Sequence, residues 1–270
     1  MRDVIVAASI AVLSSCAGAL AQQQPVVSCG GVVIAEAVVE RIVDGRTLVL
    51  QNGHEVRLAA IEVPPLGVSA DSAPAAVASR DALVALAGGD EVVLRQAESG
   101  ADRYRRILAY AYVLRDGEEI FVQGEMISAG VARVGDYVGN RTCAADLHAR
   151  EQAARAAKLG LWADSYYQVL DAENPADVLA HRGRFALVEG KVISVRQSGP
   201  TIYVNFGRRW SEDFAVTVQK RSERNFAAAG VELERLEGKR LRVRGWIEQR
   251  GSSPSIEALH PEQIELADLK

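Results

Sequence analysis

The segment from Asp44 to Pro65 constrains the fold most strongly, because it reads as a β-hairpin with a fixed end. Its first arm, residues 47–50, is mostly apolar, and Asn52-Gly53 supplies the positive φ angles of a tight hairpin turn. The return arm, residues 55–61, must stop at Pro64-Pro65 because proline cannot donate to a sheet ladder. Charged side chains lie at both ends of the hairpin: Asp44, Arg46, Arg57 and Glu62. The pattern predicts a β-sheet with a phosphate or metal site at its edge.

The first 21 residues differ in composition from the rest of the chain. Arg2 precedes an apolar run at 4–13, and Ala19-Leu20-Ala21 has the small residues of a cleavage site. Such a run is too short to span a bilayer and is typical of a secretory signal peptide, to which we assign residues 1–21. We therefore expect a periplasmic or secreted protein without a resident membrane span. Residues 13–16 also resemble a lipobox, so the alternative is an outer-membrane lipoprotein acylated at Cys16.

Cleavage after Ala21 leaves two cysteines, Cys29 and Cys143. Cysteines in an oxidising compartment usually pair, so we expect a disulfide between them, with two isolated buried thiols as the alternative. Neither cysteine has a second cysteine or a histidine at ligand spacing, which argues against a metal site there.

Alternating and helical patterns predict a first folded unit at residues 30–165. We expect strands at 30–43, 47–50, 55–61, 91–95 and 107–114, helices at 79–87, 121–129 and 144–158, and an exposed loop at 66–76. Five strands with a helix between the third and the fourth indicate a mainly β protein of the α+β class. The arrangement favours the Greek-key barrel called the OB-fold.

A polar segment at 166–184 contains Asn174-Pro175 and is predicted to be a linker. Strand patterns then return at 185–195, 202–206, 214–218, 240–249 and 256–264, around a helical segment at 225–236. We expect a second, OB-like barrel at 185–268. Residues 181–270 hold 16 Lys and Arg against 12 Asp and Glu, a net charge of +4, which is not by itself a nucleic-acid signature.

Four ordered motifs in the first unit resemble those of the staphylococcal nuclease (thermonuclease) family. They are Asp44-Gly45-Arg46-Thr47, the strand from Arg57 to Pro65, the segment from Asp102 to Ala109, and Gly160-Leu161-Trp162 at the end of the last helix. The resemblance covers residues 38–162. Each motif is weak alone, but four in order at the right spacing favour the fold of this family.

The resemblance implies an enzyme that hydrolyses DNA and RNA with Ca²⁺, in which two arginines stabilise the charged transition state. The two arginines correspond to Arg57 and Arg106. Two metal-binding aspartates correspond to Arg46 and Glu62, and the general base corresponds to Pro65, which cannot ionise. The departures imply a domain that has lost phosphodiester hydrolysis and still binds nucleic-acid phosphates, through a cationic cluster of Arg57, Arg106 and Arg46.

Several interpretations of this charged site stay open. In the first, Arg46 takes the place of the metal and neutralises Asp44 and Glu62, whereas the alternative for Arg46 is an ordinary exposed turn residue. In the second, those two acids bind Ca²⁺ in a working nuclease with an unrecognised base. In the third, the barrels are a structural or protein-interaction component of the envelope. Arg57 and Arg106 are equally compatible with ordinary salt bridges across the barrel.

Aromatic and basic residues also gather at 203–210 in the second unit. Bases stack on aromatic rings and arginines pair with phosphates, so this surface is a candidate site for single-stranded DNA or RNA. Its candidate residues are Tyr203, Arg208, Arg209 and Trp210. Alternatively, Tyr203 and Phe206, three residues apart, face opposite sides and at least one belongs to the core.

Overall fold

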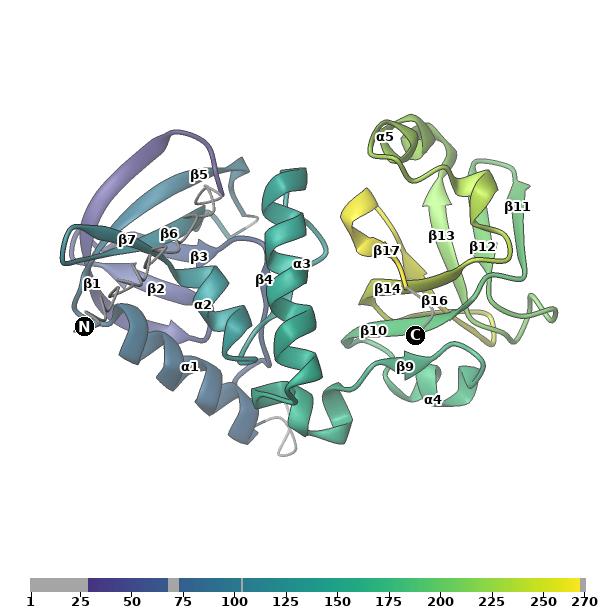
Figure 1. The fold of residues 1–270 in the computed structure, drawn as a ribbon, viewed down its shortest axis with the longest axis horizontal. Helices are drawn as coiled ribbons and strands as arrows, with labels where there is room; N and C mark the ends of the chain where they lie inside the picture. Colours follow the sequence, from purple (N-terminus) through teal and green to yellow (C-terminus); the bar gives the residue numbers. More distant parts are fainter. Residues whose placement is uncertain (1–28, 68–72, 103, 268–270) are drawn as a thin grey trace, which may run out of the picture.

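The computed structural model describes residues 29–67, 73–102 and 104–267 and has the mainly β, α+β architecture that the sequence predicts. The expected signal peptide and Cys16 lie outside the described residues. Within those residues, no helix is long and apolar enough to cross a membrane. Two β-barrels follow one another along the chain, and helix α3 (Arg141–Ala156) lies between them (Figure 1).

The first barrel consists of curved strands closed by one parallel pair. Its sheet order is β3-β2-β1-β5-β6-β7, and the parallel pairing of β3 with β6 joins the sheet into a ring. Alternate apolar residues of the strands point inward and form the core. A short separate ladder joins β4 to β8. The strands are β1 (Val33–Asp44), β2 (Thr47–Leu50), β3 (Glu55–Leu58), β4 (Ile61–Glu62), β5 (Glu91–Ala101), β6 (Ile107–Arg115), β7 (Glu118–Phe121) and β8 (Arg133–Val134).

Three helices pack on this barrel: α1 (Ala73–Ala87), α2 (Val122–Ser128) and α3. Helix α1 begins earlier than the predicted residue 79, because Pro74 is compatible with the first turn of a helix. Asn140 caps α3 by accepting a hydrogen bond from the Cys143 backbone N–H at 3.0 Å. After α3, two short 3₁₀ turns lead away from the barrel, η1 (Gly160–Ala163) and η2 (Ser165–Tyr167).

The second barrel is also closed by one parallel pair, β13 with β16. Two of its strands bend, so that β10 continues into β11 and β14 continues into β15, and each contributes to both sheets of the barrel. Along the chain, α5 lies between β13 and β14. The elements are β10 (Phe185–Lys191), β11 (Ser194–Ser198), β12 (Thr201–Asn205), β13 (Ala215–Gln219), α5 (Glu223–Ala228), η3 (Lys220–Ser222), η4 (Leu233–Leu236), β14 (Arg240–Trp246), β15 (Glu248–Arg250), β16 (Ser253–Glu257), η5 (Pro261–Gln263) and β17 (Ile264–Leu266).

The segment 166–184, which we expected to be a linker, is folded onto the second barrel. Strand β9 (Leu170–Asp171) pairs in parallel with β10, and α4 (Pro175–Ala180) follows it. Leu170, Ala172 and Val178 are buried in the second core. These elements are too short to produce a periodic pattern, which is why a polar composition alone suggested a linker. The helical segment predicted at 225–236 is likewise divided, because Gly230 has a φ of +83°.

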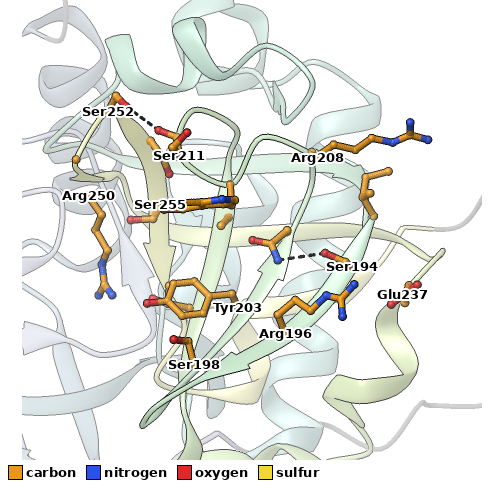
Figure 2. A pocket seen from close by; sticks show the side chains of 18 residues that line it. Ser194, Arg196, Ser198, Tyr203, Arg208, Ser211, Glu237, Arg250, Ser252 and Ser255 are labelled. Carbon is orange, nitrogen blue, oxygen red and sulfur yellow. Dashed lines mark hydrogen bonds between the residues drawn. The ribbon is translucent and has the colours of Figure 1, made fainter.

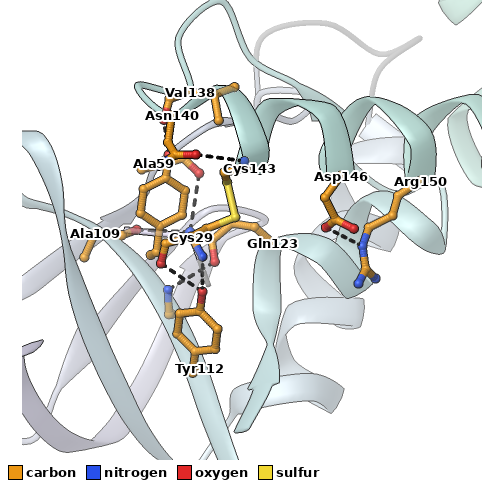
Figure 3. Close-up of a disulfide and its surroundings, with 12 residues drawn as sticks. Cys29, Ala59, Ala109, Tyr112, Gln123, Val138, Asn140, Cys143, Asp146 and Arg150 are labelled. Carbon is orange, nitrogen blue, oxygen red and sulfur yellow. Dashed lines mark hydrogen bonds and ion pairs between the residues drawn. A yellow bond between two sulfur atoms is a disulfide. The ribbon is translucent and has the colours of Figure 1, made fainter. Parts of the chain in front are cut away.

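The predicted disulfide between Cys29 and Cys143 is present, and both residues are fully buried (Figure 3). It ties the start of the described chain to the first turn of α3. The Tyr112 hydroxyl, on strand β6, also binds the backbone of Cys29. It donates to the Cys29 carbonyl at 2.8 Å and accepts from the Cys29 N–H at 2.7 Å.

A buried ion pair connects the two barrels. Arg244 of β14 is fully buried, and its guanidinium donates to Glu151 of α3 at 2.8 and 3.1 Å and to the Val134 carbonyl at 3.0 Å. Glu265 of β17 also accepts from Arg244. His148 lies beside this group, and burial together with the positive charge of Arg244 lowers the pKa of His148 to about 4. The contact therefore gains no further positive charge at neutral pH.

Candidate phosphate-binding site

The turn between β1 and β2 places Arg46 at the edge of the first barrel. Gly45 packs so closely on α1 that a Cβ there would lie 2.6 Å from the Cβ of Ser79, so this turn residue must be glycine. The Asp44 carboxylate accepts the Arg46 backbone N–H at 2.9 Å and fixes the turn. The side chain of Arg46 then points back toward the chain that leaves β3.

The connection from β3 to β4 brings Glu62 to Arg46. Ala60 has a φ of +63°, so the chain turns sharply out of the barrel sheet before β4. Glu62 accepts a hydrogen bond from the Arg46 guanidinium, and Nη2 of Arg57 lies 3.8 Å from the same carboxylate oxygen. The structure thus brings Arg46 to Glu62, as the metal-replacement hypothesis requires, but Asp44 receives the backbone N–H of Arg46 and not its side chain.

Arg106 reaches the same region from the loop between β5 and β6. Asp102 accepts from its Nε at 2.8 Å and from its backbone N–H at 3.1 Å, and it accepts the Tyr104 N–H at 2.8 Å. These bonds hold the loop in a compact turn, in which Arg105 adopts a φ of +66°. Arg106 is therefore oriented by its own loop.

Electrostatics couple the three arginines. Burial lowers the pKa of Arg57, and the positive charges of Arg46 and Arg106 lower it further, while Glu62 and Asp102 act in the opposite direction. Burial also raises the pKa of Glu62, against the effect of the surrounding guanidinium groups. Because the positive charges of Arg46 and Arg106 help to lower the pKa of Arg57, an anion added beside Arg57 would stabilise this cluster.

The residues at this site do not fit a calcium ion. Calcium needs six to eight oxygen ligands, mainly from carboxylates and carbonyls. The Glu62 carboxylate is already bonded to Arg46, and Asp44 is engaged with the turn. Among the described residues, no three histidine, cysteine, aspartate or glutamate side chains come together in a way that could hold a metal. A guanidinium at residue 46 would also repel the ion.

Glu62 lies between two small cavities. One, of about 140 Å³, is shared with Arg57 and Tyr137. The other, of about 160 Å³, lies where Pro65 and Arg133 meet residues of the second barrel and the segment before it, among them Tyr166, Arg184 and Trp246. Pro65 is at the position of the general base in the nuclease family. The second barrel therefore covers this side of the site.

Arg133 is a member of this site that the sequence did not indicate. It pairs with Glu62 across the β4–β8 ladder, and its guanidinium lies over the rings of Tyr167 and Phe185 at 5.4 and 5.1 Å. Burial lowers the pKa of Arg133. None of the four motifs of the nuclease family includes residue 133. A pair of two-residue strands is also too short to give a periodic signal in the sequence.

The candidate residues of the second barrel are separated by the structure. Tyr203, Arg208 and Trp210 line one large groove. Arg209 does not line it, because its guanidinium pairs with Glu212 at 2.7 Å in its own loop. Phe206 is buried in the core, so Tyr203 and Phe206 do face opposite sides of the strand region.

The first barrel and its arginine cluster define a nuclease-like domain of the OB-fold type. Residues 55–164 match the family model of the staphylococcal nuclease homologue, and the chain therefore contains a staphylococcal nuclease-like domain. This match supports a nuclease-like, nucleic-acid-binding protein. A comparison with curated proteins gave no match.

Proposed function

We propose that the first barrel binds nucleic acid through backbone phosphates and does not hydrolyse it. The observation that carries this proposal is the hydrogen bond from the Arg46 guanidinium to Glu62, at the position where the resemblance expects a metal ligand. In this proposal, the guanidinium of Arg46 takes the place of the metal ion that the nuclease family binds from solution. The arginines that would face the phosphate are retained, and the groups that would drive cleavage are not.

Arg57 is the central phosphate ligand in this proposal. Within the described part of the chain its guanidinium makes no hydrogen bond, and its contact with Glu62 is long, at 3.8 Å. Its donors are thus available, and a guanidinium fork matches two phosphate oxygens. Arg106 is bonded to Asp102 through Nε and Nη2, which leaves Nη1 for a second oxygen or a neighbouring phosphate.

Residues 65 and 46 are the reason to expect loss of hydrolysis. Pro65 has no ionisable group, and loss of a general base costs about 10²–10⁴ in rate. Glu62, the carboxylate retained from the metal-binding set of the resemblance, is bonded to Arg46. We further propose an exported, periplasmic or secreted location, which the Cys29–Cys143 disulfide supports because such bonds persist in oxidising compartments.

We expect Arg57→Ala with Arg106→Ala to weaken binding of the purified protein to single-stranded DNA and RNA. Each lost phosphate contact should reduce the slope of log affinity against log salt by about 0.7. Fluorescence anisotropy at several salt concentrations, with a chelator present, measures both quantities. Arg80→Ala is the matched control, because Arg80 is partly exposed on α1 and pairs with its neighbour Asp81. An unchanged affinity and slope in the double variant would exclude this site as the phosphate ligand.

A second experiment tests the loss of cleavage. We expect the natural chain to leave single-stranded DNA and RNA intact with Ca²⁺ or with chelator, because Pro65 stands at the position of the base and the described residues form no metal-binding cluster. The variant Arg46→Asp/Pro65→Glu should gain calcium-dependent cleavage, read as shortened products on a gel. Cleavage by the natural chain that requires Ca²⁺ and disappears in Arg57→Ala would establish the alternative, an active nuclease with a rearranged site. Absence of both binding and cleavage would favour a structural role in the envelope.

A further inference from the structure

A large cavity lies on the second barrel, away from the arginine cluster of the first. It is a groove of about 840 Å³ across β11, β12, β13, β16 and β15, and its size is within the usual range of ligand sites. Sheet registers fix its floor. One row of cross-strand neighbours is Arg196, Tyr203 and Thr217, and the adjacent row is Ser194, Asn205, Ala215 and Ser255.

The floor of the groove carries hydroxyl groups without partners. Thr217 is 1% exposed and Ser255 is 2% exposed, and within the described residues neither hydroxyl makes a hydrogen bond. A buried polar group without a partner normally costs free energy, so such groups are uncommon in folded proteins. Both residues line the groove, and a bound molecule whose hydrogen-bonding atoms reach these hydroxyls would satisfy them.

Cations and aromatic rings surround this floor. Figure 2 shows Tyr203 in the middle of the groove, with Arg250 on one side and Arg196 and Arg208 on the other. Arg196 and Arg208 have no hydrogen bond or ion pair within the described part of the chain. Arg250 has a long ion pair, with its Nη2 3.7 Å from Oε2 of Glu257.

The loop from β12 to β13 contributes Trp210 to the lining of the groove, and this residue is 80% exposed. Asp213 holds this loop by accepting the Arg209 N–H at 2.7 Å, and Ser252 anchors it by donating to the Ser211 carbonyl at 2.6 Å. The indole is therefore attached to a loop that these two hydrogen bonds hold in place.

We propose that this groove is a second binding site, for single-stranded nucleic acid. A base stacks on Tyr203, its flanking phosphates pair with Arg250 on one side and with Arg196 and Arg208 on the other, and the floor hydroxyls bind polar atoms of base or sugar. A planar ring between two anionic groups is the repeating unit of a nucleic-acid strand. A duplex keeps its bases stacked inside, so only an unpaired strand presents a ring to Tyr203. A neutral sugar would leave the arginines unpaired.

The test starts from the variant Arg57→Ala/Arg106→Ala, so that the first site contributes least. The probe is a fluorescein-labelled oligothymidylate of about 12 nucleotides, within the usual site size of one such barrel. We expect residual salt-sensitive binding, which Tyr203→Ala weakens by about 5- to 150-fold. Arg235→Ala is the matched control, since Arg235 is an exposed arginine of the same barrel that pairs with Glu232 and does not line the groove.

Thr217→Val separates binding from structure. Removing an unsatisfied hydroxyl while keeping the shape should leave the melting temperature unchanged or higher, and should weaken oligothymidylate binding by about 2- to 12-fold. A structural hydroxyl would lower the melting temperature and leave the affinity unchanged.

Two results would overturn the proposal. One is wild-type affinity in Tyr203→Ala and Thr217→Val. The other is binding of polygalacturonate, an acidic glycan, that depends on Tyr203 while oligothymidylate does not bind. The two proposals can be refuted independently. If the first barrel does not bind phosphate, Tyr203→Ala still weakens binding. If the groove does not bind nucleic acid, Arg57→Ala still weakens binding.

Discussion

Replacement of Arg244 by methionine is expected to lower the free energy of unfolding by about 3–5 kcal/mol. The change leaves Glu151, which is 1% exposed, as a buried carboxylate without its bidentate partner. The Val134 carbonyl loses a hydrogen bond in the same variant. Because these groups belong to the first barrel and Arg244 to the second, the loss should appear as separation of the two barrels as well as lower stability.

Urea titration followed by two signals measures this effect, since domains can unfold separately. Far-UV circular dichroism reports both barrels. Trp162 packs against Phe185 of the second barrel, so its fluorescence, measured with Trp210→Phe and Trp246→Phe in every variant compared, reports their contact. Arg235→Met is the control for removing an arginine from the second barrel. Arg244→Met/Glu151→Leu should regain much of the stability, because an apolar pair carries no desolvation cost. A single variant as stable as the natural chain would show that the ion pair does not hold the barrels together.

Removal of the disulfide is the second large effect. Cys29→Ala/Cys143→Ala should lower the free energy of unfolding by about 4–5 kcal/mol, because the bond closes a loop of 114 residues in the unfolded chain. The native contact should persist, since the Tyr112 hydroxyl still binds both backbone groups of Cys29. The variant should therefore keep the native circular dichroism spectrum while its urea midpoint falls.

A matched comparison isolates the covalent bond. Unfolding the natural chain with and without a reducing agent should reproduce the difference between it and the double alanine variant. Tyr112→Phe removes the hydroxyl contact alone and should cost about 1 kcal/mol or somewhat more for the groups left unpaired. Equal midpoints for the oxidised and reduced chain would contradict the expected role of the bond.

Sequence reasoning located the parts of the fold and site that depend on local signals. Asn52-Gly53 predicts the hairpin, which the pairing of β2 with β3 confirms. Motif spacing predicts Arg57 and Arg106 as phosphate ligands, and this role stays a prediction. Arg133 and Arg244 could not be found in this way, because two-residue strands and packing against α3 place them. In the groove, the sequence indicates Tyr203, Arg208 and Trp210 but not the floor residues that the other strands contribute. Thr217 lies beside Tyr203 only through the register of β12 with β13.

The segment at 166–184 illustrates a different limit. Its polar composition is that of a linker, yet Leu170 and Val178 are enough to attach it to the second core. Composition averages over a segment, whereas packing is decided by a few buried side chains. The early start of α1 follows the same logic, since residues 73–78 look like loop sequence until their contact with the barrel is known.

The hydrogen bond from Arg46 to Glu62 has a thermodynamic consequence. A site completed by a dissolved ion is occupied according to the concentration of that ion, and the protein gains stability only when the ion is abundant. A guanidinium tethered sixteen residues away in the same chain has a constant effective concentration. The positive charge at this edge of the barrel is therefore a property of the folded chain itself, independent of the ionic supply around it.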